Sequence, residues 1–217
     1  MTDSDHRVDL SIDQQHALRT AAVSLQRQFA GVFGTETIEK FLYSSYDQFA
    51  SRAVIPNFLP LLAERFARQR LTALARVEGK MHDGRPVVLF LCTHNAGRSQ
   101  IALGFFQRLA GERAVAWSGG SEPGEQVNPA AVAVMREVGI DISAEFPKPW
   151  TDEIVQAADV VITMGCGDSC PLFPGKRYVD WELDDPAGLG VEQVRPIRDQ
   201  IEQKVRGLLG ELDVPAA

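Results

Sequence analysis

Three stretches within the first eighty residues carry apolar side chains at the spacing of one helix face. The first begins at Ser11, and its apolar stripe consists of Ala17, Leu18, Ala21, Ala22, Leu25 and Phe29. The second covers about 36–53, and the third begins near Asn57 and ends at Gly79. Ser11 and Gln14 have capping-box spacing, and Asn57 is expected to cap the third helix. Three amphipathic helices with short connections predict a small antiparallel bundle.

The pattern changes after residue 84 to short apolar runs that alternate with helical segments. Residues 85–91 are typical of a fully buried strand, and 99–109 follows with apolar residues at helical spacing. Further strands are predicted at 114–118, 159–164 and 176–181, and further helices at 128–138, 151–157 and 191–212. This alternation implies an α/β fold with a doubly wound parallel sheet. The chain therefore divides into a helical bundle at residues 1–80 and an α/β domain at residues 84–217.

Composition and charge exclude several classes of protein. Of the 217 residues, 45% are hydrophobic and 24% are charged, as is ordinary for a soluble globular protein. A net charge of −7 without a compensating basic run argues against binding to nucleic acid. No stretch approaches the roughly 20 apolar residues that span a bilayer, and the polar, acidic N-terminus is unlike a secretory signal. Three cysteines fit a reducing compartment better than a disulfide scaffold, so we expect a cytoplasmic protein without membrane association.

The candidate chemistry centres on residues 91–100, which join a predicted strand to a predicted helix. Cys92 stands at the end of the strand and Arg98 at the start of the helix. The residues between them must turn sharply, and we expect Gly97 to supply a positive φ. Backbone N–H groups in such a turn form an anion-binding nest, to which the Arg98 guanidinium adds a planar donor. The residues expected around the oxyanion are Thr93, His94, Asn95, Ala96, Gly97, Arg98 and Ser99.

Cys92 is the candidate nucleophile. The field that holds the anion also favours the thiolate, which is the nucleophilic form of cysteine. The alternative is that Cys92 is a buried structural thiol and Arg98 an ordinary surface residue, as isolated cysteines and arginines often are. The combination of strand, cysteine, five-residue turn, arginine, serine and helix favours the site.

The segment from Cys92 to Ser99 resembles the phosphate-binding loop of low-molecular-weight protein tyrosine phosphatases and of the arsenate reductases that share their fold. Gln100 stands where the phosphatases usually have proline, which is similar to the arsenate reductase branch. The resemblance covers about residues 84–212, and it implies that Asn95 and Ser99 support the loop and the thiolate. The first eighty residues are similar to a helical N-terminal extension of some actinobacterial arsenate reductases. For this bundle, a homodimerisation or docking role and a merely packing role both stay open.

Asp185 and Pro186 resemble the general-acid loop of the same family. A carboxyl group is needed because the leaving oxygen must take a proton as the thiolate attacks. The alternative is an ordinary turn aspartate before proline. Ala187 and Gly188 stand where the phosphatases typically have two tyrosines that frame an aromatic substrate. A small inorganic oxyanion, arsenate with phosphate as a competitor, therefore fits better.

Cys166 and Cys170 form a second candidate group at the end of a predicted strand. They could be half of a zinc site, but no second pair of cysteines or histidines completes it, or they could be structural thiols. The resemblance implies instead a relay in which Cys166 attacks the Cys92 adduct and Cys170 passes the disulfide to an external reductant. The short spacing leaves two reductants open, thioredoxin or a mycothiol and mycoredoxin system.

We thus expect an arsenate reductase that binds no cofactor or metal and depends on an external thiol reductant. The second hypothesis is a phosphatase acting on phosphotyrosine or small phosphomonoesters, which would have no use for Cys166 or Cys170. The third is a regulator that binds arsenite or an oxyanion through its three thiols. The presence of an acid candidate in Asp185 argues against this non-enzymatic role.

Overall fold

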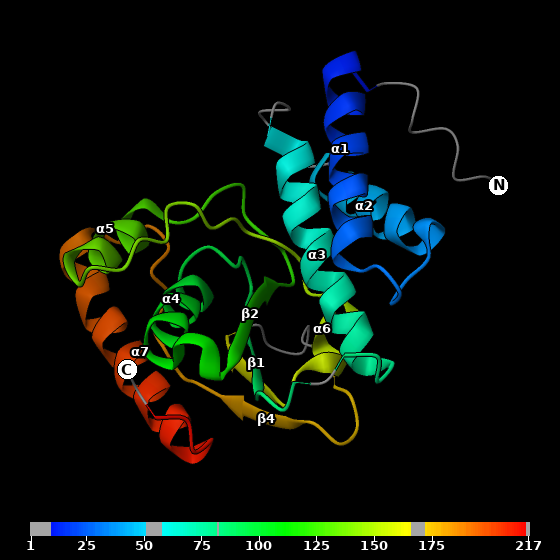
Figure 1. The fold of residues 1–217 in the computed structure, drawn as a ribbon. Coiled ribbons are helices and arrows are strands. Elements are labelled where there is room, and N and C mark those ends of the chain that lie inside the picture. Colours follow the sequence, from blue (N-terminus) through cyan, green and yellow to red (C-terminus); the bar gives the residue numbers. More distant parts are fainter. Residues whose placement is uncertain (1–9, 51–57, 82, 166–171, 216–217) are drawn as a thin grey trace. The chain divides into compact units, whose positions relative to one another are not determined.

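The computed structural model describes residues 10–50, 58–81, 83–165 and 172–215. The chain folds as two compact units, Met1–Lys80 and Met81–Ala217 (Figure 1). None of the described helices combines the length and the apolar character that a membrane-spanning helix requires.

The first unit contains the three expected helices, α1 (Ile12–Gln28), α2 (Thr35–Ala50) and α3 (Leu59–Val77). Ser11 and Gln14 form the predicted capping box at the start of α1. Asn57, the expected N-cap of α3, lies outside the described residues. The N-cap residue is Phe58 instead, and its side chain makes no cap bond, so the prediction is wrong. The unit buries one apolar stripe of each helix, and its most deeply buried side chains include Leu18, Leu25, Ile38, Leu42, Phe66 and Leu71.

The second unit is built on a sheet of four parallel strands in the order β2-β1-β3-β4. The strands are β1 (Val87–Cys92), β2 (Val115–Gly120), β3 (Val160–Met164) and β4 (Arg177–Asp180). All six residues of β1 are buried, as the continuous apolar run predicts for a central strand. Because the strands are parallel, their carboxyl ends meet at one edge of the sheet.

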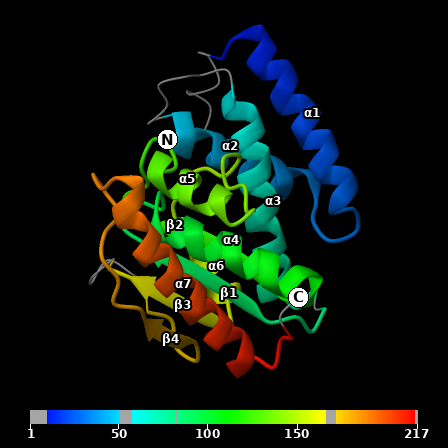
Figure 2. The same cartoon turned by 90° about the vertical axis from the view of Figure 1, so that its left-hand side faces the viewer.

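Helices cover both faces of this sheet, which confirms the predicted fold class. They are α4 (Arg98–Ala110), α5 (Pro129–Glu137), α6 (Asp152–Ala157) and α7 (Val191–Glu211). Helices α4, α5 and α7 lie on one face, and α6 lies on the other (Figures 1 and 2). Asn128 caps α5 and Pro129 opens it, as the sequence predicts.

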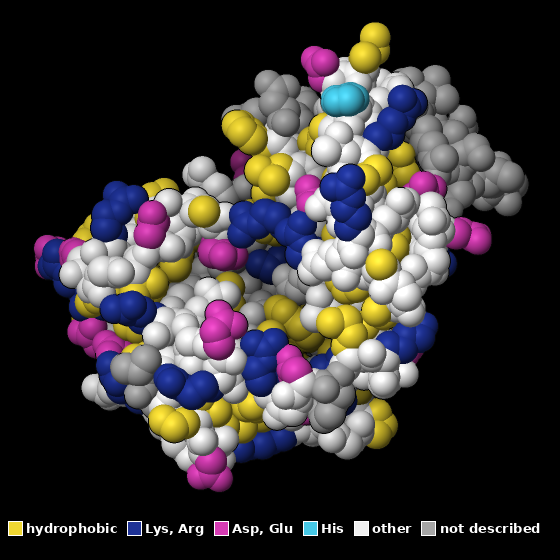
Figure 3. Space-filling model, in the orientation of Figure 1, with side chains coloured by type: hydrophobic (Ala, Val, Ile, Leu, Met, Phe, Trp, Pro, Cys, Tyr) yellow, Lys and Arg dark blue, Asp and Glu magenta, His cyan; other side chains and the backbone are white. Residues whose placement is uncertain are grey.

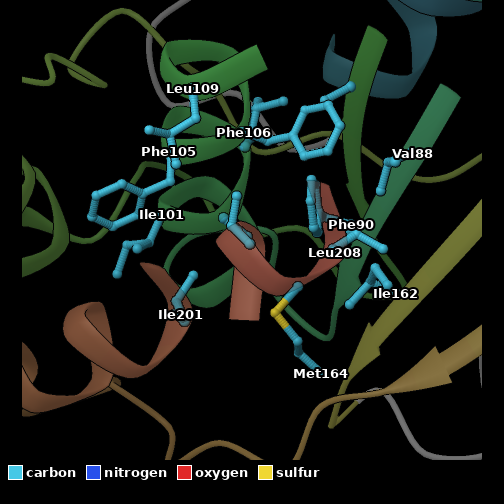
Figure 4. Packing of buried hydrophobic residues seen from close by; sticks show 14 of the residues in the cluster. Val88, Phe90, Ile101, Phe105, Phe106, Leu109, Ile162, Met164, Ile201 and Leu208 are labelled. Atoms are coloured by element: carbon cyan, nitrogen blue, oxygen red, sulfur yellow. The ribbon is translucent and has the colours of Figure 1, made fainter. Parts of the chain in front are cut away.

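The main core lies between the sheet and the layer of α4, α5 and α7 (Figure 4). Alternate residues of β1, Val88 and Phe90, point into it. The ring of Phe90 packs edge-on against Phe106 of α4, with 5.7 Å between the centroids. This packing fixes α4, and therefore Arg98 at its first turn, against the end of β1.

The surface of the second unit mixes charges of both signs. Acidic and basic side chains are interspersed on the face seen in Figure 3. One such group joins α5 to α7, where Glu137 pairs with Arg195 at 2.8 Å and with Arg198 at 3.0 Å. The hydrogen bonds from Arg195 are the largest cause of a lowered pKa at Glu137.

Replacement of Phe106 by alanine should destabilise the second unit by about 3–5 kcal/mol, because the ring is fully buried and leaves a cavity. Tryptophan fluorescence during urea unfolding isolates this unit, since Trp117, Trp150 and Trp181 all belong to it. Leu172→Ala is the control, because Leu172 is 79% exposed, and it should stay within about 0.5 kcal/mol of the parent. Equal midpoints for the two variants would contradict this account of the core.

Candidate active site

Cys92 is the last residue of β1, at the point where the strand order reverses between β1 and β3. Ligands of doubly wound sheets bind at such a switch point. The thiol is 3% exposed, and it is the free cysteine among the described residues. The loop after it leads directly into α4, whose first residue is Arg98.

Several carbonyl groups of this loop point away from its interior and are held there by hydrogen bonds. The carbonyls of Thr93, His94 and Ala96 accept hydrogen bonds of 2.8–2.9 Å from backbone N–H groups of residues 122–128. The His94 ring also contacts the Glu122 carbonyl at 3.0 Å. In a planar trans peptide the following N–H points the opposite way. The N–H groups after these anchored carbonyls therefore face the interior of the loop, which is the arrangement that an anion nest requires.

Asn95, and not Gly97, is the left-handed residue of the turn, so the expectation for Gly97 is wrong. Asn95 has φ of 47°, whereas Gly97 has φ of −123°. Asparagine tolerates this region because its short polar side chain bonds nearby groups. Glycine is needed at 97 for a different reason, since a Cβ there would lie 2.5 Å from Cγ of Pro186.

A hydrogen-bond chain links Asn95 to Cys92, the candidate nucleophile. Asn95 Nδ2 donates to Ser99 Oγ at 2.8 Å, and Ser99 Oγ lies 3.0 Å from Cys92 Sγ. Since Ser99 Oγ accepts from Asn95, its own hydrogen is available to the sulfur. Asn95 and Ser99 are both fully buried. The arrangement places the Ser99 hydroxyl against the sulfur and holds the Cys92 side chain in one orientation.

Gln100 donates hydrogen bonds to Asn95 and so holds it in place, a role that the sequence did not predict. Its buried Nε2 donates to Asn95 O at 3.0 Å, to Asn95 Oδ1 at 3.2 Å and to Phe146 O at 3.2 Å. The backbone N–H of Lys148 adds a bond of 3.0 Å to Asn95 Oδ1. The polar residue directly after Arg98 and Ser99 was the available signal, because a buried glutamine must find partners. Nothing in the sequence indicated that Phe146 and Lys148 would bond to Gln100 and Asn95.

The loops after β1 and β4 meet at Arg98. Its side chain is 8% exposed, and one terminal nitrogen of the guanidinium lies 2.7 Å from Asp185 Oδ2. The other terminal nitrogen donates to Leu183 O at 3.3 Å. Gly165, at the end of β3, lets the side chain pass, since a Cβ there would lie 2.9 Å from Nη1. The structure thus brings the predicted anion-binding arginine and the predicted acid together.

The candidate relay cysteines, Cys166 and Cys170, lie outside the described residues. The residue before them, Gly165, is next to the nucleophile loop, because Thr93 Oγ1 donates to its carbonyl at 2.9 Å. Within the described ranges, no three His, Cys, Asp or Glu side chains are grouped so that they could hold a metal ion.

Comparison with known proteins agrees with this geometry. Residues 87–215 match the family model of low molecular weight phosphotyrosine protein phosphatases, and residues 18–75 match that of the N-terminal domain of protein-tyrosine-phosphatase-like proteins. The structure of a thioredoxin-dependent arsenate reductase from Corynebacterium glutamicum is similar, with a TM-score of 0.82 and 42% identity over 92% of this chain and 98% of that one.

Two shorter relatives match more than half of the chain. A glutaredoxin arsenate reductase of Synechocystis is 37% identical over 128 residues, which cover 58% of this chain and 97% of the relative. An arsenate reductase of Halalkalibacterium halodurans is 39% identical over 132 residues, covering 56% of this chain and 94% of the relative.

Replacement of Gly97 by alanine should destabilise the second unit by about 1–3 kcal/mol, because the new methyl group overlaps Pro186. Gly207→Ala is the matched control. It makes the same change on the open side of α7, where a Cβ meets nothing within 4 Å, and it should stabilise by about 0.5–1 kcal/mol. Urea unfolding followed by tryptophan fluorescence measures both. A Gly97→Ala protein as stable as the parent would show that Pro186 does not pack on the loop.

Proposed function

The chain belongs to the low-molecular-weight phosphotyrosine protein phosphatase family, and we propose that it is a cytoplasmic arsenate reductase of that family. The observation that carries this function is the meeting of Cys92, the nest-forming loop and the Arg98–Asp185 pair at one edge of the sheet. Residues 84–217 are the catalytic domain, and residues 1–80 are an accessory helical domain. Arsenate is the substrate, and phosphate competes with it because both are tetrahedral oxyanions of similar charge.

The oxyanion site consists of the loop residues Thr93, His94, Asn95, Ala96, Gly97 and Ser99 together with the guanidinium of Arg98. Support comes from the N–H groups of His94, Asn95 and Gly97, which follow the anchored carbonyls and face inward. Arg98 is paired with Asp185, so an oxyanion and the carboxylate compete for the same guanidinium. Arrival of arsenate frees the carboxyl group of Asp185 beside the bound anion. The freed carboxylate takes up a proton from the acidic form of arsenate or from solvent, and Asp185 is then placed to deliver that proton to the departing oxygen.

The first chemical step joins sulfur to arsenic. The Cys92 thiolate attacks the arsenic atom, an As–O bond breaks, and the oxygen leaves as water after taking a proton from Asp185. The Ser99 hydroxyl, oriented by Asn95, stabilises the thiolate before this attack. Arsenic is still As(V) in the adduct, so this step resembles the chemistry of a phosphatase.

Reduction takes place in the second step. The Cys166 thiolate attacks the Cys92 sulfur, an S–S bond forms, and the electron pair of the S–As bond stays on arsenic, which leaves as arsenite, As(III). Cys170 then attacks Cys166 and releases the Cys92 thiolate. The remaining Cys166–Cys170 disulfide passes to an external reductant. Thioredoxin is our first choice, because the similar C. glutamicum enzyme depends on it; mycothiol with mycoredoxin is the alternative. No bound cofactor takes part.

A phosphatase is the alternative function for the same loop. The absence of an aromatic wall argues against an aryl substrate, since Ala187 and Gly188 follow Pro186. The Ala187 N–H instead closes a tight turn on Asp185 Oδ1 at 3.0 Å. These small residues leave room for an inorganic oxyanion, and phosphate in the loop explains any residual hydrolysis.

Purified protein should consume NADPH when arsenate is added with thioredoxin and thioredoxin reductase. Cys92→Ser should abolish this turnover, because no sulfur adduct can form. Cys166→Ser and Cys170→Ser should lower it at least 100-fold but leave any hydrolysis of p-nitrophenyl phosphate intact, since hydrolysis needs no disulfide. Turnover only with mycothiol, mycoredoxin and mycothione reductase would show that mycothiol, and not thioredoxin, is the reductant. Hydrolysis without arsenate-dependent turnover would contradict the proposed arsenate reductase activity.

The N-terminal bundle is proposed to pair two copies of the chain. Ile12 and Val23, which are 84% and 44% exposed, lie eleven residues apart on one outward side of α1, and His16, Arg19 and Arg27 line a hollow on the same helix. Ile12 and Val23 are the large hydrophobic residues of α1 that are exposed, so pairing through this side of the helix would bury apolar surface.

Ile12→Asp together with Val23→Asp should therefore raise the dimer dissociation constant at least ten-fold in sedimentation equilibrium. Leu172→Asp, which charges an exposed residue of the other unit, is the control and should leave the association unchanged. A monomeric parent protein, or a dimer that tolerates both charges, would contradict pairing through this face.

A further inference from the structure

Asn128 touches three elements of the site, although the sequence marks it only as a helix cap. Its backbone N–H donates to Ala96 O in the nucleophile loop at 2.8 Å. Its side-chain Nδ2 donates to Pro186 O in the loop that carries Asp185, at 3.1 Å. Its Oδ1 accepts from the N–H groups of Ala130 and Ala131, at 2.8 and 3.3 Å, and so caps α5. One residue therefore joins the nucleophile loop, the acid loop and the start of a helix.

The amide orientation of Asn128 follows from its partners. The two N–H groups of the helix start require an acceptor, which is Oδ1, and the Pro186 carbonyl requires a donor, which is Nδ2. A flipped amide would set oxygen against oxygen and nitrogen against nitrogen. Capping needs only the oxygen, and serine or aspartate supplies one equally well. The NH₂ group is thus a feature that helix capping does not explain.

Four contacts hold the acid loop. Arg98 pairs with Asp185 and donates to Leu183 O, the Pro186 ring packs on Gly97, and Asn128 holds the Pro186 carbonyl. If arsenate takes the Arg98 guanidinium, the two contacts from Arg98 are lost at the moment when the acid is needed. Two contacts then remain, and the one from Asn128 is a directed hydrogen bond.

We propose that Asn128 is a positioning residue that holds Asp185 over the Cys92 loop while Arg98 is occupied by the oxyanion. This inference rests on the proposed function, in which Asp185 is the general acid. It predicts that loss of the Nδ2 donor slows the proton-dependent step and leaves oxyanion binding and the helix cap unchanged.

Asn128→Asp and Asn128→Ser test the proposal in the full chain, because both keep the cap and remove the donor to Pro186. The assay is single-turnover arsenite release by the fully reduced protein. Both variants should lower the maximal rate about ten-fold, a part of the 10²–10⁴-fold that a placed general acid contributes. The arsenate concentration for half-maximal rate should stay within two-fold. Pro129→Ala, which perturbs the same helix start and leaves both Asn128 bonds, should keep the parent rate.

The Asp185→Asn background separates positioning from general damage. If Asn128 acts through Asp185, Asn128→Asp should cause no further loss in Asp185→Asn, whereas a multiplied loss would overturn the proposal. A parent rate in Asp185→Asn itself would refute the acid assignment. Amide hydrogen exchange gives a readout that needs no activity. In Asn128→Asp, exchange should accelerate at least five-fold in residues 183–189 and stay unchanged in α5, and unaltered exchange in 183–189 would overturn the inference even if the protein reduced no arsenate.

Discussion

The site depends on one buried residue whose backbone conformation is unfavourable for most residues. Asn95 adopts a left-handed backbone with φ of 47°, and its side chain and carbonyl bond to Ser99, Gln100 and the Lys148 N–H. These bonds outweigh the roughly 1–2 kcal/mol that a left-handed L-residue costs. Because the turn bends there, the neighbouring carbonyls reach residues 122–128 and the N–H groups face inward.

The site also depends on the close approach of two loops, the one after Cys92 and the one that carries Asp185. Pro186 lies so close to residue 97 that only glycine fits, and Asp185 then reaches Arg98 at 2.7 Å. The guanidinium therefore has two anionic partners available, the carboxylate of the protein and the oxyanion of the substrate. In our proposal, exchange of one for the other couples substrate binding to release of the acid. Asn128 keeps the acid loop in place during that exchange.

The proposed chemistry differs from that of a phosphatase only after the sulfur adduct has formed. The Cys92 loop contains one thiol, and reduction of As(V) to As(III) needs a second thiol that forms a disulfide with it. Strand β3 ends at this edge, where Gly165 accepts a hydrogen bond from Thr93, and Cys166 is the next residue in the chain. In our proposal, parallel strands that share one edge allow a phosphatase-like loop and a redox pair to serve one reaction.

The sequence by itself determined the elements and the main candidates, because these depend on local spacing. About ten residues of sequence are enough to predict each local feature: the apolar run before Cys92, the helical stripe after Arg98 and the cap at Asn128. The alternation of strands and helices predicted the parallel sheet. Tertiary structure alone decided which residue of the turn is left-handed, why residue 97 must be glycine, and that Arg98 pairs with Asp185. The last two depend on Pro186 and Asp185, and the first depends in part on Lys148. These partners are far away in the sequence and come close only when the strands have taken the order β2-β1-β3-β4.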